Sequence, residues 1–460
     1  MAKAKRSSSE KSFFDAMAGV VAKSDHIAPD QYVRYNVKRG LRNPDGTGVL
    51  VGLTDVGDVH GYIIDEKEKK PVPGRLSYRG IDIKEITRGF HKEKRHGFEE
   101  IVFLLLFGML PTKKELAAFT AILDERRMLP DGFKENMILR HPSKDLMNLI
   151  ARSVLNLYSF DEAAEDRTLA NVLRQSVELI ARIPAIAAYG YQAKMHYHND
   201  GSLYLHKPKH SLSTSESFLH LLRPDSNYSP LEADLLDLAF VLHAEHGGGN
   251  NSTFAVHCIA STDTDTYSSI AAAVGSLKGK KHGGANIEVI QMMDDIKKHV
   301  RDWSSEKQVE KYIVKIIEKK AFDRTGLVYG MGHAVYTLSD PREEILRERA
   351  EALAAEKKRS DEFNLYRLVQ TLTPKVFADV KRSDKPICAN VDFYSGFVYS
   401  MLGIPTDLFA PIFAISRMAG WTAHLLEEHV SGGRIIRPAY KYIAGERSYM
   451  PLSMRVPSER

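Results

Sequence analysis

The stretch SPLEADLLDLAFVLHAEHGGG, which covers residues 229–249, contains start and stop signals for a helix. Ser229 is followed by a proline and then by Glu232, which together form a capping box with proline at the first helical position. Leucines at positions 231, 235, 238 and 242 recur at spacings of four, three and four, which predicts one apolar helix face. The three glycines at 247–249 predict the end of this helix.

Most of the chain on either side of this stretch is also predicted to be helical. A second long helix is expected over residues 408–428, where apolar and small residues around Arg417 indicate burial. Charged helices are expected over residues 291–320 and 342–359. The fold class is therefore mainly α.

The N-terminal part has a different pattern. Residues 1–35 are predicted to form a loose tail followed by a helix. Residues 49–53 and 59–64 are short β-rich runs separated by glycines and aspartates, so they predict a small β ribbon. We therefore expect a small N-terminal β element beside the helical bulk.

Composition restricts the class of protein. A chain of 460 residues is longer than chains that usually fold around a single hydrophobic core, so two domains are favoured. A hydrophobic content of 43% and a charged content of 27% are typical of a globular enzyme. The net charge of +5 is small and spread along the chain, which argues against nucleic acid as a partner.

The cysteines and the apolar runs indicate the cellular compartment in which the protein is expected. Cys258 and Cys388 are the two cysteines and form no CxxC pair, which favours a reducing compartment over a disulfide framework or a thiolate zinc site. No apolar run approaches the roughly 20 residues that span a membrane. Residues 1–12 are basic and Ser-rich without an apolar signal core, which favours a disordered bacterial N-terminus over a transit peptide. The expected location is the bacterial cytoplasm.

His243 and His246 lie three residues apart, on one face at the end of the first helix. They can complement the helix dipole, bind an anion, or bind a metal together with Glu245. The order H-x-E-H differs from the H-E-x-x-H metalloprotease pattern, and no third ligand is evident. No metal site is therefore predicted, and the first two interpretations stay open.

Three further segments are weak signals individually. His282 precedes two glycines and follows a small basic cluster at 278–281. The glycines of 330–332 allow backbone N–H groups to approach a phosphate. Asp340 and the following proline look like a helix start, which places Arg342 in the first turn. A cation is unfavourable there, so its presence indicates a bound anion.

Asp392 is the one carboxylate in the largely apolar stretch 390–396. Desolvation would raise its pKa above the reference of about 3.9 and make the carboxylate a better base. An aspartate before an apolar run is equally typical of a helix cap. The residues alone do not decide between these two interpretations.

In combination, these segments resemble the citrate synthase family. The blocks 332–342 and 390–396 are highly specific together. The resemblance extends over about residues 40–440, in the segments 40–43, 46–53, 76–80, 243–254, 281–286, 330–342, 390–396, 405–424 and 436–438.

The resemblance implies a reaction and three catalytic residues. The family condenses acetyl-CoA with oxaloacetate and hydrolyses the resulting thioester to citrate. By resemblance, Asp392 removes a proton from the acetyl methyl group, His282 hydrogen-bonds the thioester oxygen, and His333 polarises the oxaloacetate carbonyl. A thioester methyl is a very weak acid, so its anion needs both a base at carbon and a donor at oxygen.

The resemblance also assigns binding residues. It implies that oxaloacetate is bound by His246, Arg342, Arg417 and Arg437. Arg437 reaches the site from the partner subunit, which implies a homodimer. Coenzyme A is expected along Leu327, Val328, Tyr329, Gly330, Met331 and Gly332, with Lys385 and the 278–281 cluster as weaker phosphate contacts. Acetyl-CoA is a co-substrate, and no permanently bound cofactor is expected. Ala334 and Thr337 replace residues that are often basic in this family.

The resemblance implies a two-domain helical fold. The large domain is expected to comprise residues 1–283 and 399–460, the small domain residues 284–398, and closure to exclude water from the site between them. Three alternatives remain: a 2-methylcitrate synthase acting on propionyl-CoA, a binding or regulatory protein that has lost catalysis, and a histidine-based metallohydrolase.

Overall fold

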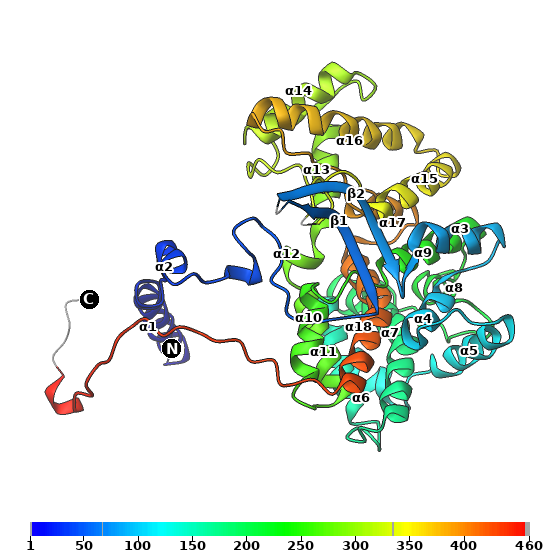
Figure 1. The fold of residues 1–460 in the computed structure, drawn as a ribbon. Coiled ribbons are helices and arrows are strands. Elements are labelled where there is room, and N and C mark those ends of the chain that lie inside the picture. The colour runs from blue at the N-terminus through cyan, green and yellow to red at the C-terminus, as the bar shows by residue number, and fades with distance from the viewer. Residues whose placement is uncertain (1, 67, 334, 456–460) are drawn as a thin grey trace. The chain divides into compact units, whose positions relative to one another are not determined.

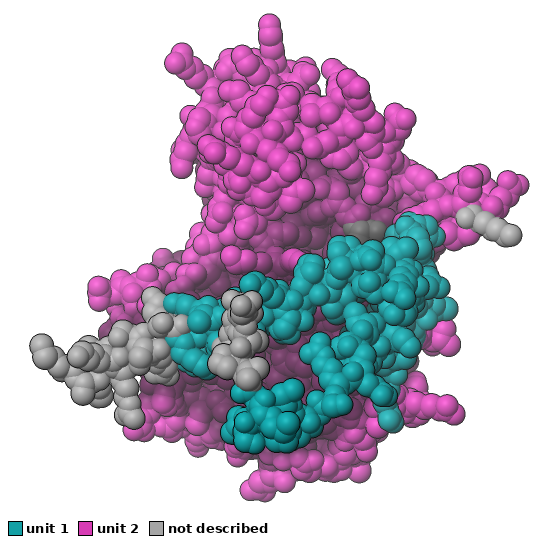
Figure 2. Space-filling view, turned by 90° about the vertical axis from the view of Figure 1, so that its left-hand side faces the viewer, with its two compact units in different colours: residues 1–51, 437–460 teal, residues 52–436 magenta. Residues whose placement is uncertain are grey.

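The computed structural model describes residues 2–66, 68–333 and 335–455. The chain divides into two compact units, which Figure 2 shows in different colours. Unit 1 consists of both chain ends, residues 1–51 and 437–460, and unit 2 consists of residues 52–436. Every candidate residue named above except Arg437 belongs to unit 2.

Unit 1 contains α1 (Ala2–Ser24), α2 (Pro29–Arg34) and two short 3₁₀ turns, Arg39–Leu41 and Leu452–Met454. The helix from Ala2 contradicts the prediction of a loose tail. Alanine and lysine are frequent in this segment and favour a helix. The two chain ends meet within the unit, where the Lys441 ammonium lies 5.9 Å from the centre of the Tyr35 ring.

The β element is a three-stranded antiparallel sheet in the order β1 (Gly57–Asp65), β2 (Glu68–Tyr78), β3 (Ile81–Asp82). The strand predicted over residues 59–64 is confirmed, but residues 49–53 form no strand. The partner is β2, whose two prolines and charged residues hide the strand pattern. A Cβ at Gly74 would meet the backbone oxygen of Ser339, so this glycine allows β2 to lie against the loop before the helix that begins at Pro341.

Unit 2 is otherwise helical. Its α-helices are α3 (Ile83–Lys92), α4 (Phe98–Phe107), α5 (Lys113–Arg126), α6 (Leu146–Tyr158), α7 (Leu169–His198), α8 (Thr214–Leu222), α9 (Pro230–His243), α10 (Asn251–Ala260), α11 (Thr266–Leu277), α12 (Lys280–Gly283), α13 (Ala285–His299), α14 (Glu306–Ile317), α15 (Pro341–Glu356), α16 (Ser360–Lys381), α17 (Asp392–Met401) and α18 (Phe409–Ser431). A π-helical turn (Lys134–Leu139) precedes α6, and a 3₁₀ turn (Thr406–Leu408) precedes α18.

Helices α9 and α18 confirm the two strongest helix predictions. The Ser229–Glu232 capping box is present, and α9 ends at His243, a few residues before the glycines. Leu235, Leu238 and Leu242 are buried and Leu231 is partly buried. Phe240 and Val241 are buried too, so the helix is covered on more than one face. Arg417 and Trp421 on α18 are fully buried. These helices place charged and polar groups in the centre of unit 2.

The predicted charged helix 291–320 is two helices, α13 and α14, because the backbone becomes extended at Val300. Figure 1 shows α13, α14 and α16 together at the top of unit 2, beyond the β1–β2 ribbon. The division into domains at 283/284 and 398/399 stays a prediction. None of the helices that the structure describes is both long and apolar enough to span a membrane.

Candidate active site

Arg417 on α18 is a completely buried cation. Its Nε donates to the backbone oxygen of His243 at 2.7 Å, and its guanidinium lies 4.7 Å from the centre of the Phe413 ring. Its two terminal nitrogens are buried and have no hydrogen-bond partner among the described residues. Burial lowers the pKa of Arg417 to about 10, although Glu245 and Tyr78 act to raise it. Unpaired buried donors on a cation indicate that this position binds an anion.

His246 follows α9 and lies beside the same cluster. Its ring packs edge-to-face on His333 at 5.3 Å and on Tyr336 at 5.6 Å between centroids. Its Nε2 is buried and unpaired within the described part of the chain. Burial, reinforced by Arg342, holds the pKa of His246 well below its usual value. The imidazole is therefore neutral at pH 7.

His243 has a different environment from His246. Its Nδ1 donates to the backbone oxygen of Ala239 at 2.9 Å, and burial lowers its pKa to about 3. His243 therefore has a structural contact with its own helix, although the Nε2 atoms of both histidines are buried without a partner among the described residues. Glu245, the third member of the metal group considered for His243 and His246, contacts Gly247 and His424 through Oε1.

Arg342 lies in the first turn of α15, as predicted. Its Nε and Nη2 contact the two oxygens of Asp340 at 3.0 and 2.7 Å, and Asp340 also caps the helix by accepting from the Arg342 N–H. The backbone N–H of Val391 donates to the same carboxylate at 3.2 Å. Asp340 thus joins the start of α15 to the start of α17, where Asp392 lies.

His333 is held by backbone hydrogen bonds. Its Nδ1 accepts from the N–H groups of Val335 and Tyr336 at 3.0 and 3.1 Å, and its ring stacks on Tyr336 at 4.8 Å. A nitrogen that accepts carries no proton, so the proton of this imidazole is on Nε2. His333 can therefore donate a hydrogen bond from Nε2.

A backbone pairing brings the His333 and Asp392 segments together. Met331 and Ala389 form an isolated antiparallel bridge, and Asn390 donates to Gly330 and Gly332 from its backbone and its side chain at 2.9 and 2.8 Å. Gly330 has a φ of +75°, and a Cβ there would lie 2.9 Å from the Phe393 Cα. The glycine is therefore required for this close approach.

Asp392 is the first residue of α17 and is not its cap, because the N-cap position is Val391. The helix-cap interpretation is therefore wrong. Burial raises the pKa of the Asp392 carboxyl to about 6, although Arg342 and Arg417 act to lower it. The predicted direction of this pKa change is confirmed.

His282 lies on the short helix α12. Its Nε2 is 3.1 Å from the hydroxyl of Ser252, which also accepts from the indole N–H of Trp421. Burial and the charge of Arg417 lower the pKa of His282 to about 4. The Ser252 hydroxyl donates to Oδ1 of Asn250 at 2.8 Å, so in this arrangement it accepts from Nε2 of the neutral His282.

Arg417 connects these residues. It interacts electrostatically with His246, His282 and Asp392 and with Arg342. The sequence did not reveal Tyr336 or Ser252 as members of this cluster. Nothing in the sequence around Ser252 indicates that it contacts His282, which lies 30 residues further along the chain. Tyr336 lies beside His333, but an aromatic residue after a glycine loop is ordinary.

The other predicted residues are described by their exposure and by the unit that holds them. The residues expected to bind coenzyme A differ in their exposure to solvent, since Leu327 is 56% exposed whereas Val328 is buried. Lys385 is exposed. Ala334 lies outside the described residues, and Arg437 is an exposed residue of unit 1.

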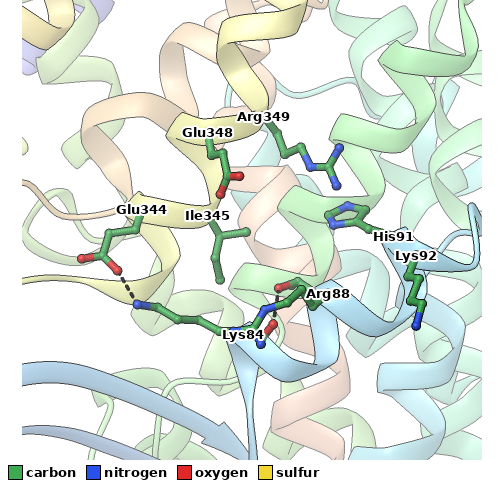
Figure 3. A pocket seen from close by; sticks show the side chains of 9 residues that line it. Lys84, Arg88, His91, Lys92, Glu344, Ile345, Glu348 and Arg349 are labelled. Carbon is green, nitrogen blue, oxygen red and sulfur yellow. Dashed lines mark hydrogen bonds and ion pairs between the residues drawn. The ribbon is translucent and has the colours of Figure 1, made fainter.

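A separate cavity of about 480 Å³ lies between α3 and α15. Figure 3 shows it lined mainly by charged side chains, among them Lys84, Arg88 and Arg349. Lys84 is paired with Glu344 at 2.5 Å. None of the predicted catalytic or substrate-binding residues lines this cavity. It is therefore distinct from the candidate active site.

Comparisons with known proteins bear on both the fold and the site. A family model described as "Citrate synthase, C-terminal domain" matches residues 45–439. A citrate synthase of Haloferax volcanii is 34% identical over 416 residues, covering 89% of this chain and 96% of that protein. A 2-methylcitrate synthase of Shewanella oneidensis is 33% identical over 385 residues, covering 83% and 92% of the two chains. The solved ternary complex of the Thermoplasma acidophilum citrate synthase with carboxymethyl coenzyme A and oxaloacetate is similar with a TM-score of 0.74 at 27% identity, covering 91% of this chain and 99% of that one.

Proposed function

The chain belongs to the citrate synthase family of acyl-transferring condensing enzymes, and we propose that it condenses acetyl-CoA with oxaloacetate and hydrolyses citryl-CoA to citrate and coenzyme A. The main observation in support is the buried guanidinium of Arg417, whose two terminal nitrogens have no partner in the described part of the chain. A dicarboxylic substrate would satisfy these donors. A planar fork suits a carboxylate better than a lysine ammonium would.

Proton removal from acetyl-CoA is assigned to Asp392. Because burial raises its pKa to about 6, the carboxylate is ionised at pH 7 yet is a stronger base than an exposed aspartate. The neutral His282 donates from Nδ1 to the thioester oxygen as negative charge develops there. Donation from Nδ1 requires the Ser252 hydroxyl to turn from Oδ1 of Asn250, 2.8 Å away, and to donate to Nε2 of His282 instead. Base and donor together stabilise the enol or enolate.

Carbon–carbon bond formation is assigned to the His333 side of the site. The proton on Nε2 of His333 polarises the oxaloacetate carbonyl and then passes to the new alkoxide oxygen. Two backbone N–H groups hold the opposite nitrogen, so the donor points in a fixed direction. Preorganised donors of this kind need little rearrangement during the reaction.

The oxaloacetate carboxylates are assigned to Arg342 and Arg417, with His246 contributing its free Nε2 and Arg437 of a partner subunit completing the set. This arrangement makes the enzyme a homodimer. Acetyl-CoA acts as co-substrate along residues 327–332, with Lys385 as a phosphate contact. The small domain 284–398 closes over the large one, and the enzyme works in the cytoplasm.

A 2-methylcitrate synthase is the second candidate, because a relative of that name is almost as similar as the citrate synthases. One methylene changes binding by only about 1–3 kcal/mol in a pocket, so small differences in the pocket decide the preference. The test is the ratio of kcat/KM for acetyl-CoA and propionyl-CoA with oxaloacetate. A ratio above one supports citrate synthesis, and a ratio below one supports the alternative.

Release of free thiol from acetyl-CoA in the presence of oxaloacetate tests for catalysis itself. We expect thiol release that depends on oxaloacetate. Its absence with both acyl-CoA substrates would indicate a binding or regulatory protein.

A further inference from the structure

Two histidines of unit 2 that the proposed reaction does not use point ring nitrogens at each other. His257 on α10 and His424 on α18 are 3.1 Å apart, measured from Nε2 to Nδ1. Oε2 of Glu427, one turn further along α18, lies 3.4 Å from the same Nδ1. One ligand atom from each of these three residues lies within 4.8 Å of the other two.

The outward nitrogens of both rings face carboxylates. Nε2 of His424 is 3.1 Å from Oε1 of Glu245, and Nδ1 of His257 is 2.8 Å from Oε2 of Glu428. An ionised carboxylate only accepts, so each histidine donates its N–H outward. The lone pairs that remain on His257 and His424 then point at each other. Histidines oriented by an outer carboxylate in this way are typical of metal ligands.

The charges around the two rings also favour a cation. Three glutamates, Glu245, Glu427 and Glu428, surround the pair. Oε2 of Glu427 is buried and makes no hydrogen bond within the described residues. The other oxygen accepts from the Asp55 N–H at 2.7 Å, which fixes the carboxylate.

We propose that His257 Nε2, His424 Nδ1 and Glu427 Oε2 bind a zinc ion, with water as the fourth ligand. Two imidazoles and one carboxylate are a ligand set that zinc accepts. Metal–ligand bonds of about 2.0–2.1 Å in a tetrahedron separate the ligand atoms by roughly 3.3 Å. The two separations of 3.1 and 3.4 Å match this spacing. The site differs from the group of His243, Glu245 and His246 considered in the sequence.

The ion would join α10 to α18 and would also act on the candidate active site. Oε1 of Glu245 accepts from both His424 and the backbone N–H of Gly247, the residue after His246. A metal on Nδ1 of His424 keeps the proton on Nε2 and so keeps this contact with Glu245. The zinc ligands are therefore positioning residues for the turn that carries His246.

Metal content tests the site without reference to catalysis. Wild-type protein produced with added zinc and then desalted should hold about one zinc ion per chain, measured by inductively coupled plasma mass spectrometry. Glu427→Gln and His257→Gln should hold none above background. His429→Gln, a matched change on the same helix outside the cluster, should keep the metal. Retention of zinc by both cluster variants would overturn the proposal.

Two further readouts cover the case in which a variant folds poorly. Cobalt(II) added to apo wild-type protein should give the strong visible bands of a four-coordinate ion, and Glu427→Gln should not. Zinc should raise the melting temperature of the wild type and of His429→Gln but not of Glu427→Gln. A cobalt spectrum like that of the hydrated ion, with no zinc-dependent thermal shift in wild type, would mean that the two rings share a proton instead.

Discussion

Burial determines which protonation states the candidate active site can use. His246 and His282 are held neutral at pH 7, whereas Asp392 has a pKa of about 6. A neutral imidazole carries one N–H group and one lone pair, so it can donate one hydrogen bond and accept another. A carboxylate whose pKa lies near the working pH is a more effective base than one near 4. The different roles proposed for these residues follow from their different environments.

Asp392→Asn tests the base directly. The amide keeps the size of the side chain but cannot accept the proton, so kcat should fall by about 10²–10⁴-fold. Oxaloacetate binding, measured by calorimetry, should be retained. A variant that keeps more than about a tenth of wild-type kcat would remove Asp392 from this role.

The pH profile should follow the same carboxyl group. The proposed reaction needs Asp392 ionised, so kcat/KM with acetyl-CoA should be constant at neutral pH and fall as the pH drops through about 6. His282, with a pKa of about 4, stays neutral across this window and does not contribute. The residual activity of Asp392→Asn should show no inflection near pH 6. An unchanged inflection in that variant would assign it to another group.

At the scale of elements, the sequence predicted those features that depend on residues close together in the chain, such as the start of a helix. The capping box fixed the start of α9 because its hydrogen bonds involve residues three apart. The burial of α18 followed from its composition. The partner of β1 could not be predicted, because strand pairing depends on contacts that the proline-containing β2 makes only in the fold. The same limit applies to Asp392, whose cap and base interpretations differ only in its tertiary surroundings.

The loop 330–332 offers a matched pair of glycine variants. Gly330 and Gly332 both have positive φ values, of 75° and 89°, so alanine introduces backbone strain at either position. Only at Gly330 would the new Cβ also collide with Phe393, next to Asp392. Gly330→Ala should therefore lower the melting temperature and kcat more than Gly332→Ala does. Equal losses in the two variants would mean that the loop does not position Asp392.

At the scale of the whole molecule, the candidate site combines segments that are remote in the sequence. Asp340 contacts Val391 across 51 positions in the candidate active site, and His257 contacts His424 across 167 positions in the proposed zinc site. The resemblance to a known family identified the residues of the candidate active site, since residues that meet in the fold occur together in a family's motifs. It supplied nothing for the pair of His257 and His424, and residue order gave no signal for it.

Oxaloacetate should bind before acetyl-CoA if closure builds the site. Its proposed ligands include Arg342 from the predicted small domain and Arg417 from the predicted large one, so binding favours the closed form. Oxaloacetate alone should raise the melting temperature by mass action, and initial-rate kinetics should be ordered. Random-order kinetics without a thermal shift would argue against a site built by closure.

Arg437 should serve the active site of the other subunit. It is an exposed residue of unit 1, and the unit that contains it is formed by both ends of the chain. In a two-fold symmetric dimer each subunit gives one such arginine and receives one. A dimer of Arg437→Ala alone lacks the arginine in both sites, and a dimer of Asp392→Asn alone lacks the base in both sites, so each variant should be inactive by itself. In a mixed dimer, however, both defects fall in one site and the other site is intact.

Subunit exchange between these two inactive variants should therefore restore activity. With free exchange half of the dimers are mixed and each has one good site, so the mixture should recover about a quarter of wild-type activity by symmetry. Native mass spectrometry of a size-tagged variant verifies that mixed dimers form. Each variant incubated alone is the control and should stay inactive. A mixture that stays inactive after verified exchange would place Arg437 in its own subunit's site or outside any site, because only a crossing arginine separates the two defects.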